Sequence, residues 1–208
     1  MTSNTQAKTI GELRDSNYRV VPVREELRNN LIAKIRAEEI VFPGIVGFDE
    51  TVIPQLENAI LAGQDVILLG ERGQAKSRVI RSLVHLLDAY IPKIAGCEIN
   101  DSPYSPICRA CRDKVAEQSD ATEIEWLHRD DRYAEKLSTP DISIADLIGE
   151  VDPIKVAEGH YLSDELVIHY GLVPRSNRGV FCINELPDLA ERIQVGLFNL
   201  MEERDVQI

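Results

Sequence analysis

The order of apolar and polar positions predicts two helices early in the chain and two buried strands further on. Apolar side chains recur at helical spacing from residue 23 to about residue 39, namely Val23, Leu27, Leu31, Ile32 and Ile35. A second helix is expected at about 51–62, where Gly63 follows its end. The uninterrupted apolar runs at 66–69 and 180–183 are typical of short strands covered on both faces.

The first apolar run leads into a glycine-containing loop that ends in Lys76-Ser77. Residues 66–77 read VILLGERGQAKS, and an amphipathic helix closed by Pro92 is expected to follow. Strand, loop and helix in this order form a P-loop, in which backbone N–H groups and a lysine hold the phosphates of ATP and a hydroxyl binds Mg²⁺. We predict that Ser77 is the Mg²⁺ ligand and that ATP is bound by Gly70, Glu71, Arg72, Gly73, Gln74, Ala75, Lys76 and Ser77.

This loop departs from the full P-loop pattern at one position. The pattern G-x-x-x-x-G-K-[ST] has a glycine before the lysine, where this chain has Ala75, and Gly73 is an additional glycine. The alternative is a strand-to-helix turn that carries a lysine by chance, and the order of the surrounding elements disfavours it.

The second apolar run ends at Asn184-Glu185, where P-loop ATPases carry Asp-Glu. In those enzymes the aspartate holds the Mg²⁺ shell and the glutamate polarises the attacking water. We therefore predict that Glu185 is the general base and that Asn184 accepts a hydrogen bond from metal-bound water. Because Asn184 is uncharged, hydrolysis is expected to suffer more than binding. A buried strand capped by an ordinary polar pair is the alternative.

Three of the four cysteines lie between the two motifs, in a polar segment at 92–138 that is expected to be rich in loops. Cys97, Cys108 and Cys111 have the spacing C-x10-C-x2-C, which is typical of an incomplete zinc site. His128 is the one histidine of this segment and is the predicted fourth ligand. Free reduced thiols and an iron–sulfur cluster remain as alternatives. The fourth cysteine, Cys182, falls in the second apolar run and is expected to be buried.

The composition limits the partners of the chain. Its 23 basic and 35 acidic residues give a net charge of −12, which disfavours contact with the phosphate backbone, so no nucleic-acid partner is expected. No apolar run is long enough to span a membrane. Residues 1–18 are polar, are expected to be loosely ordered, and do not have the character of a signal peptide. The expected location is therefore the cytoplasm.

Three stretches together resemble the AAA+ ATPases, in the branch of the magnesium-chelatase ATPase subunit and the MoxR-type ATPases. Residues 42–47, FPGIVG, resemble the segment beside the adenine, which implies ATP contacts by Val46 and Gly47. Residues 61–77 resemble the family's L-x-G-x-x-V-L-L-x-G-x-x-G-x-x-K-S core. Residues 171–185, GLVPRSNRGVFCINE, are similar to its G-L-L-x-x-A-x-R-G-x-L-x-x-D-E segment.

This resemblance implies a P-loop NTPase αβα sandwich with a parallel sheet and a homo-oligomeric ring, usually a hexamer, that binds ATP between subunits. ATP turnover by this ring would act on a client protein, or on a von Willebrand-type partner protein in the MoxR branch. The implied organisation is an N-terminal extension at 1–40 with an amphipathic helix, and an ATP-binding core at 41–208. The core would contain the cysteine insertion at 92–138 and a client-contacting hairpin insert at 139–178. The family's sensor 1 strand, arginine finger and lid are expected beyond Ile208, so the chain is expected to be truncated before the lid.

The leading functional hypothesis is an ATP-hydrolysing subunit that remodels a partner protein. A nucleotide-binding switch or scaffold with weak hydrolysis is the second, because Ala75 and Asn184 both depart from the motifs. An AAA+ transcription activator is the third, and it is disfavoured because the G-A-F-T-G-A string of that class does not occur.

Overall fold

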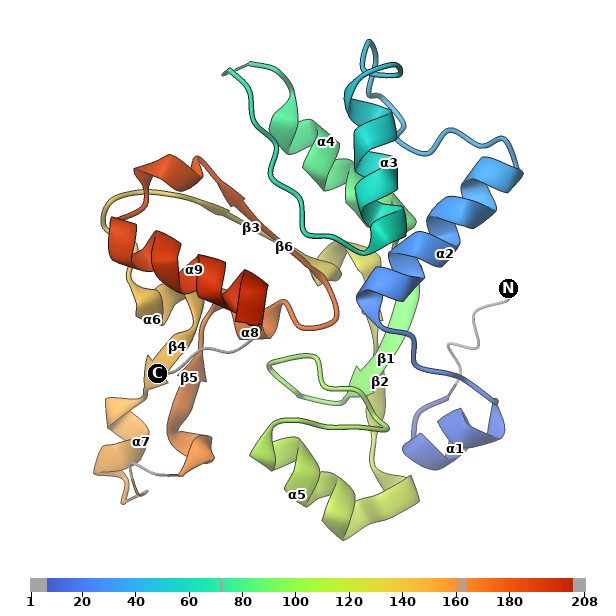
Figure 1. The fold of residues 1–208 in the computed structure, drawn as a ribbon. Helices are drawn as coiled ribbons and strands as arrows, with labels where there is room; N and C mark the ends of the chain where they lie inside the picture. Colours follow the sequence, from blue (N-terminus) through green and yellow to red (C-terminus); the bar gives the residue numbers. More distant parts are fainter. Residues whose placement is uncertain (1–6, 72, 160, 162–163, 204–208) are drawn as a thin grey trace. The chain divides into compact units, whose positions relative to one another are not determined.

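The computed structural model describes residues 7–71, 73–159, 161 and 164–203 (Figure 1). The chain forms two compact units, one of Val21–Ala89 and one of Met1–Val20 with Tyr90–Ile208. The division into an extension at 1–40 and a core at 41–208 stays a prediction. Among the described residues, none of the helices combines the length and apolar character needed to cross a bilayer.

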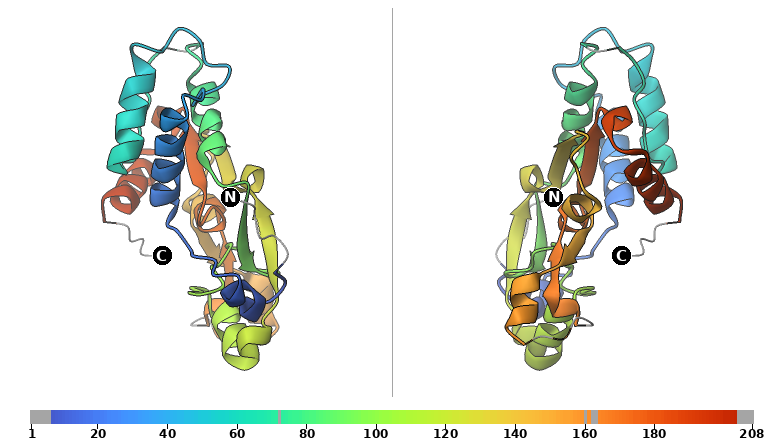
Figure 2. Two further views of the ribbon diagram at one scale, coloured as in Figure 1. Left: turned by 90° about the vertical axis from the view of Figure 1, so that its right-hand side faces the viewer. Right: turned by 90° about the vertical axis from the view of Figure 1, so that its left-hand side faces the viewer.

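The unit of residues 21–89 is built from helices, which Figure 2 shows from two sides. These are α2 (Val23–Arg36), α3 (Val52–Ala62), α4 (Lys76–Ser82) and the 3₁₀ turn η1 (Leu83–Leu86). Both predicted N-terminal helices are present. Acidic residues in the first turn of α2 and basic residues in its last turn complement the helix dipole. The core of this unit consists of Leu31, Val41, Phe42, Ile45, Leu56, Ile60, Val79 and Leu86.

Polar side chains of α2 hold the segments that follow α3 and η1. Gly63 takes a left-handed conformation with a φ of 66° and ends α3, as its glycine predicts. Arg24 on α2 forms two hydrogen bonds of 2.9 Å with the Asp65 carboxylate and one of 2.7 Å with the Gly63 carbonyl. The buried Glu26 carboxylate accepts a 2.6 Å hydrogen bond from the Asp88 N–H. Residues 63–65 and 88 are therefore held on the first helix of the unit.

The second unit contains three pairs of strands among its described residues. An antiparallel pair joins β1 (Tyr90–Ile94) to β2 (Ile124–His128), and a second joins β4 (Gly149–Val151) to β5 (Ile168–Tyr170). The parallel pair consists of β3 (Tyr133–Leu137) and β6 (Val180–Asn184). The helices are α1 (Ile10–Asp15), α5 (Arg109–Gln118), α6 (Ile144–Leu147), α7 (Pro153–Ala157), α8 (Leu172–Arg175) and α9 (Glu191–Glu203). Short 3₁₀ turns are η2 (Ser119–Ala121), η3 (Arg129–Arg132), η4 (Glu165–Val167) and η5 (Leu186–Asp188).

The parallel pair is the centre of one hydrophobic core. Phe181 and Ile183 of β6 pack against Ile193 and Leu197 of α9, which lies beside the pair in Figure 1. Leu147 at the end of α6 is fully buried in the same core. Helices packed on parallel strands confirm the predicted α/β class.

Three expectations from the sequence are wrong here. Residues 7–16 are well packed, because Ile10 and Leu13 of α1 are buried with Ile124 and the Trp126 indole donates a 2.9 Å hydrogen bond to the Ala7 carbonyl. The segment at 92–138 is not mainly loop, since it supplies most of β1 and all of α5, β2 and β3. Pro92 lies inside β1 and does not close the preceding helix, which ends at Ser82.

Candidate functional site

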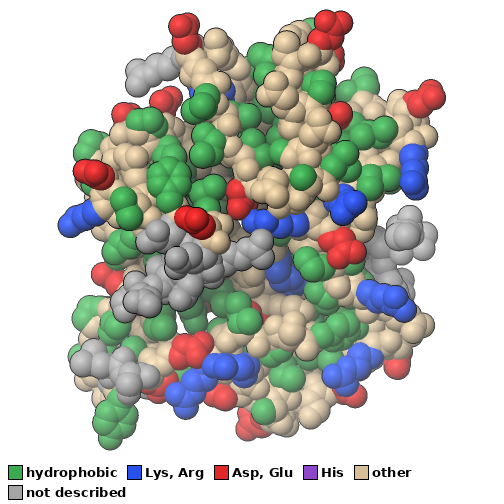
Figure 3. Space-filling model, viewed as in Figure 1, with side chains coloured by type: hydrophobic (Ala, Val, Ile, Leu, Met, Phe, Trp, Pro, Cys, Tyr) green, Lys and Arg blue, Asp and Glu red, His purple; other side chains and the backbone are tan. Residues whose placement is uncertain are grey.

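The predicted P-loop lies in the unit of residues 21–89, but its strand is not formed there. Residues 66–69 have no strand assignment, and 55% of Ile67 and 91% of Leu69 are exposed. The prediction of a buried strand at this position is therefore wrong for the described structure. A strand needs a neighbour for its backbone hydrogen bonds, and the described residues of this unit supply helices only. Figure 3 shows hydrophobic side chains reaching the surface of the molecule.

The loop itself closes on the predicted phosphate-binding lysine. The Lys76 ammonium donates hydrogen bonds of 2.8 Å to the Gly70 carbonyl and 2.7 Å to the Glu71 carbonyl. Lys76 is the first residue of α4, and Ser77 follows it in the first turn. The Gly70 and Glu71 carbonyls thus hold one cation at the start of α4. A lysine held at the start of a helix is the arrangement on which phosphate binding depends.

The position that departs from the P-loop pattern has a backbone that favours glycine. Ala75, the N-cap of α4, has a φ of 56° and a ψ of 18°, in the left-handed region. The loop therefore keeps the conformation of the usual glycine, at a cost of about 1–2 kcal/mol for the alanine side chain. Gly73 has a φ of 84°. The remaining ATP-binding predictions are Val46, which is 84% exposed, Gly47 in the same loop, Gln74, and Arg72, which lies outside the described residues.

The predicted catalytic pair lies in the other unit, at the end of β6. Asn184 is the last residue of the strand, and its side-chain amide donates to the Glu135 carboxylate on β3. Its carbonyl oxygen faces the Cys182 sulfur at 3.6 Å. Glu185 follows with a φ of 55° and an exposed side chain. The Glu185 carboxylate therefore lies at the surface, whereas the Asn184 side chain is hydrogen-bonded within the sheet.

Glu135 is a residue that sequence reasoning missed. It also accepts a 3.0 Å hydrogen bond from the hydroxyl of Tyr133, whose pKa is raised mainly by burial. Glu135 lies opposite Cys182 in the parallel register. Alternation along β3 places it beside the motif, but its position depends on which strand pairs with β6, and no local pattern reveals that pairing.

The Arg178-Gly179 pair holds the start of β6 against β1 and the turn before β3. The Arg178 guanidinium donates a 2.7 Å hydrogen bond to the Pro92 carbonyl. Its own carbonyl accepts hydrogen bonds of 2.9 and 2.7 Å from the side chain of Arg132, which is only 2% exposed. A Cβ on Gly179 would lie 2.1 Å from the Arg132 carbonyl oxygen, so no other residue fits there without movement.

The segments predicted to form a hairpin insert do meet. Gly149 at the start of β4 pairs with Tyr170 at the end of β5. A Cβ on Gly171 would lie 2.5 Å from the backbone of Leu147, which shows how closely the two segments approach. Their contact with a client stays a prediction.

Three cysteines come together as their spacing predicts. Cys97, in the turn after β1, and Cys108 and Cys111, at the start of α5, are all buried. Burial raises the pKa of Cys108 to about 11 and raises that of Cys111 further. Their sulfurs share the site with a carboxylate oxygen of Asp101, and all four atoms lie within 4.8 Å of one another.

His128 is not part of this group, and its prediction as the fourth ligand is wrong. It pairs with Tyr90 at one end of the β1–β2 hairpin, whereas the cysteines follow Ile94 at the other end. Four residues of strand separate the two ends by roughly 13 Å. The His128 ring lies against that of Tyr90, with centroids 5.0 Å apart, and its Nδ1 accepts a hydrogen bond from the Asp130 N–H.

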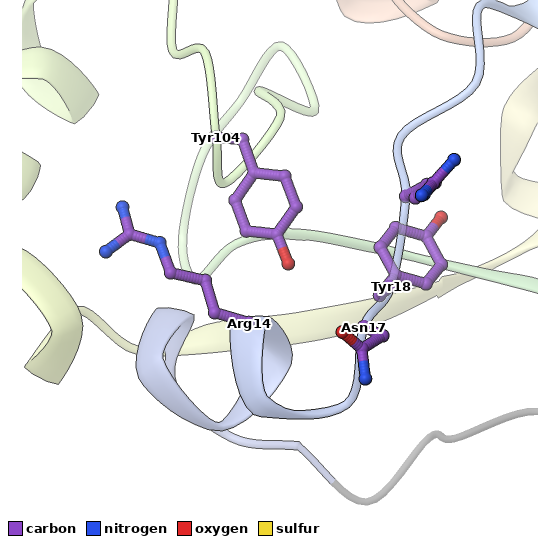
Figure 4. Close-up of a pocket in the computed structure, with 5 residues that line it drawn as sticks. Arg14, Asn17, Tyr18 and Tyr104 are labelled. Carbon is purple, nitrogen blue, oxygen red and sulfur yellow. The ribbon is translucent and has the colours of Figure 1, made fainter.

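An open hollow of about 330 Å³ lies between α1 and the loop that carries Tyr104 (Figure 4). Its residues are Arg14, Asn17, Tyr18, Arg19 and Tyr104. Arg14 forms an ion pair with Asp120, and Tyr18 packs edge-on against Trp126. We assign no chemistry to this hollow.

Comparisons with known proteins agree with the likeness of the motifs. No protein-family model matches the chain. It is 29% identical over 150 residues to magnesium-chelatase subunit ChlI-2, chloroplastic, of Arabidopsis thaliana, a match that covers 70% of this chain and 33% of that protein. A solved complex between subunits BchI and BchD of magnesium chelatase contains a chain that matches with a TM-score of 0.53 and 23% identity. The match covers 77% of this chain and 46% of the other.

The fold of this chain resembles that of part of a chain in this magnesium chelatase complex. The sequence likeness to the Arabidopsis subunit agrees with this fold. The chain spans about a third of the length of that relative. These comparisons concern magnesium chelatase, and a relationship to the MoxR branch stays a prediction.

Proposed function

We propose that this chain is an ATP-binding and ATP-hydrolysing subunit of AAA+ type, similar to the ATPase subunit of magnesium chelatase, that remodels a partner protein from within a ring. The observation that carries the proposal is the lysine site. Lys76 begins α4, and the preceding loop wraps its ammonium in the Gly70 and Glu71 carbonyls. The similarity to magnesium chelatase supports the same function.

We expect the phosphates of ATP to bind where these two carbonyls now contact the ammonium. Two neutral oxygens at 2.8 and 2.7 Å satisfy the Lys76 ammonium, and phosphate oxygens bind such a cation more strongly because they carry charge. ATP would replace the carbonyls at the ammonium, and the loop N–H groups would turn toward its phosphates. The Ser77 hydroxyl, in the first turn of α4, is an oxygen ligand of the kind that Mg²⁺ prefers. The ion would offset the charge of the β- and γ-phosphates.

Glu185 would take a proton from the water that attacks the γ-phosphorus, while ADP leaves. Its carboxylate is exposed, and its backbone is held in the left-handed region at the end of β6. Asn184 would contribute no negative charge beside it. This supports the second candidate, a nucleotide-binding switch with weak hydrolysis, because the amide of Asn184 is already engaged by Glu135.

Calorimetric titration with ATP and Mg²⁺ tests the binding site. Lys76→Ala should weaken ATP binding by at least about 100-fold, because the phosphates lose contacts worth about 3 kcal/mol. Lys34→Ala is the matched control, since Lys34 is a lysine of the same unit that pairs with Glu39 at the surface. Equal affinities for the Lys76→Ala variant and the parent chain would contradict the assignment.

Phosphate release and molecular mass, measured with and without ATP, separate the two candidates. A remodelling subunit should release phosphate and increase in mass when ATP is bound. A switch should bind ATP with negligible turnover.

A further inference from the structure

The group formed by Cys97, Asp101, Cys108 and Cys111 has the composition of a metal site. Three sulfurs and a carboxylate oxygen lie within 4.8 Å of one another, and all four residues are buried. They come from two segments, the turn that follows β1 and the start of α5. Ligands of a tetrahedral zinc ion are about 3.8 Å apart when the zinc–sulfur distance is about 2.3 Å. The observed group therefore needs only a small contraction around one ion.

The carboxylate of Asp101 lacks one of the partners that a buried charge requires. Asp101 is 0% exposed. Its Oδ2 accepts hydrogen bonds of 3.1 Å from the Ile107 N–H and 3.0 Å from the Cys108 N–H. Its Oδ1 is buried and has no hydrogen-bond partner among the residues that the structure describes. A buried carboxylate oxygen without a partner is destabilising, and a cation at the neighbouring sulfurs would remove this cost.

The backbone around the sulfurs is arranged to support thiolates. The Asp101 N–H donates to the Cys97 sulfur at 3.3 Å, and the Cys111 N–H donates to the Cys108 sulfur at 3.4 Å. Donors of this kind stabilise negative charge on sulfur and orient metal ligands. Two lysines stand nearby, since Lys93 donates to the Cys97 carbonyl and Lys114 to the Ala95 carbonyl, each at 3.1 Å.

We propose that Cys97, Asp101, Cys108 and Cys111 bind one Zn²⁺ ion in a tetrahedral site with a structural role. On binding, each of the three thiols loses its proton to solvent and its sulfur forms a bond to the ion. Three thiolates and one carboxylate carry four negative charges, so the bound site has a net charge of −2. The Lys114 ammonium, hydrogen-bonded to the Ala95 carbonyl, would offset part of that charge, whereas the Lys93 ammonium already pairs with the Glu125 carboxylate at 3.0 Å. Four protein ligands close the coordination sphere, which is typical of structural rather than catalytic zinc.

The site would fix α5 and, through it, the segment before β5. Arg109 and Arg112 of α5 form ion pairs of 2.8 and 2.7 Å with Asp164 and Glu165. The core at this place is small and contains Ile94 and Ile99 beside the cysteines, so a metal ion would contribute much of its cohesion. A cavity of about 240 Å³ borders the cysteines, Lys155 and Tyr170, and gives an ion access from solvent.

Metal analysis of the purified full chain tests the proposal. We expect close to one zinc per chain in the parent protein and in two controls, Cys182→Ser and His128→Ala. Cys182 is also a buried cysteine, but it lies in β6, and His128 lies at the far end of the hairpin. A folded parent chain that contains no zinc and takes up none would overturn the proposal, as would iron with acid-labile sulfide in its place.

Asp101→Asn is the decisive variant. The asparagine carbonyl can still accept from the Ile107 and Cys108 N–H groups, so the turn is retained, but its amide nitrogen cannot bind the ion. In competition with a chelating dye, Asp101→Asn should bind zinc at least about 100-fold more weakly than the parent chain. Affinity equal to that of the parent would remove Asp101 from the ligand set.

Cobalt substitution of the parent chain tests the ligands without any variant. Co²⁺ bound to three thiolates should give sulfur-to-metal charge-transfer absorption and the strong visible bands of a tetrahedral site. A spectrum without these features would overturn the three-cysteine assignment. If the ion is structural, chelation should also raise amide hydrogen exchange in Arg109–Gln118, and unchanged exchange there would contradict that role.

Discussion

The side-chain amide of Asn184 donates a hydrogen bond to the carboxylate of Glu135 on the neighbouring parallel strand. This contact gives a physical reason for an asparagine at a position where P-loop ATPases carry aspartate. An aspartate there would face Glu135 with a second negative charge and would lose the donor. The Asn184 side chain therefore stabilises the sheet, while its lack of charge weakens the predicted catalytic pair.

Asn184→Asp should lower the free energy of unfolding by about 1–3 kcal/mol at pH 7, because a hydrogen bond is replaced by repulsion between carboxylates. The repulsion raises the pKa of one carboxyl in the folded state above its value in the unfolded chain. The loss should therefore be small well below pH 4, appear as the pH rises through that raised pKa, and stay constant above it. Urea unfolding at pH values below, near and above the raised pKa measures this loss of stability. In the double variant Asn184→Asp/Glu135→Gln the amide returns on the other strand, so most of the loss should be recovered.

Glu185→Gln should retain ATP binding and lower phosphate release by about 10²–10⁴-fold, because the amide cannot take a proton from the attacking water. Glu185 is exposed and follows the end of β6, so its replacement by an amide of the same shape should leave stability unchanged. Glu191→Gln changes another exposed carboxylate, in the first turn of α9, and should leave turnover intact. Undiminished phosphate release by the Glu185 variant would show that the base is another group.

Ala75→Gly should stabilise the chain slightly, by about 0.5 kcal/mol. The left-handed backbone at Ala75 costs about 1–2 kcal/mol with a side chain present, and the greater freedom of glycine in the unfolded chain offsets part of the gain. Ala59→Gly makes the same chemical change inside α3, where it should destabilise by about 0.5–1 kcal/mol. Chemical unfolding of both variants checks the difference in sign. If both destabilise equally, the left-handed conformation at Ala75 is wrong.

The accuracy of the sequence predictions follows the range of the interactions involved. The helices near residues 23–36 and 52–62 were predictable because helical periodicity and a closing Gly63 are local signals. The run at 66–69 has equally clear apolar character, but a strand forms only where another strand pairs with it. A short segment of sequence does not show which strand that is. The predictions of the zinc ligands differ for the same reason. Cysteine spacing is local, whereas the choice between His128 and Asp101 depends on the register of the β1–β2 hairpin.

Arg132 shows a further limit of sequence reasoning. It lies in the sequence RDDR, which is typical of a solvated turn, yet it is almost fully buried and holds the Arg178 carbonyl. Charged residues are rarely buried without partners, and its partner lies 46 residues away. The likeness of residues 171–185 to a family segment was recognisable, but the packing of Arg178 and Gly179 against Arg132 was not.

Gly179→Ala tests that packing directly. The added methyl group would lie 2.1 Å from the Arg132 carbonyl oxygen and 3.1 Å from that of Ser176, and both neighbours are backbone. The start of β6 must therefore move away from Arg132, which weakens the hydrogen bonds at Arg178, and we expect a loss of about 2–4 kcal/mol in the free energy of unfolding. Gly196→Ala is the matched control. Its methyl group would meet only the Ile144 side chain at 3.6 Å, and alanine favours the α9 helix by about 1 kcal/mol, so this variant should be neutral or more stable. Similar stabilities of the two variants in urea unfolding would show that the close approach of Gly179 to Arg132 does not exist in solution.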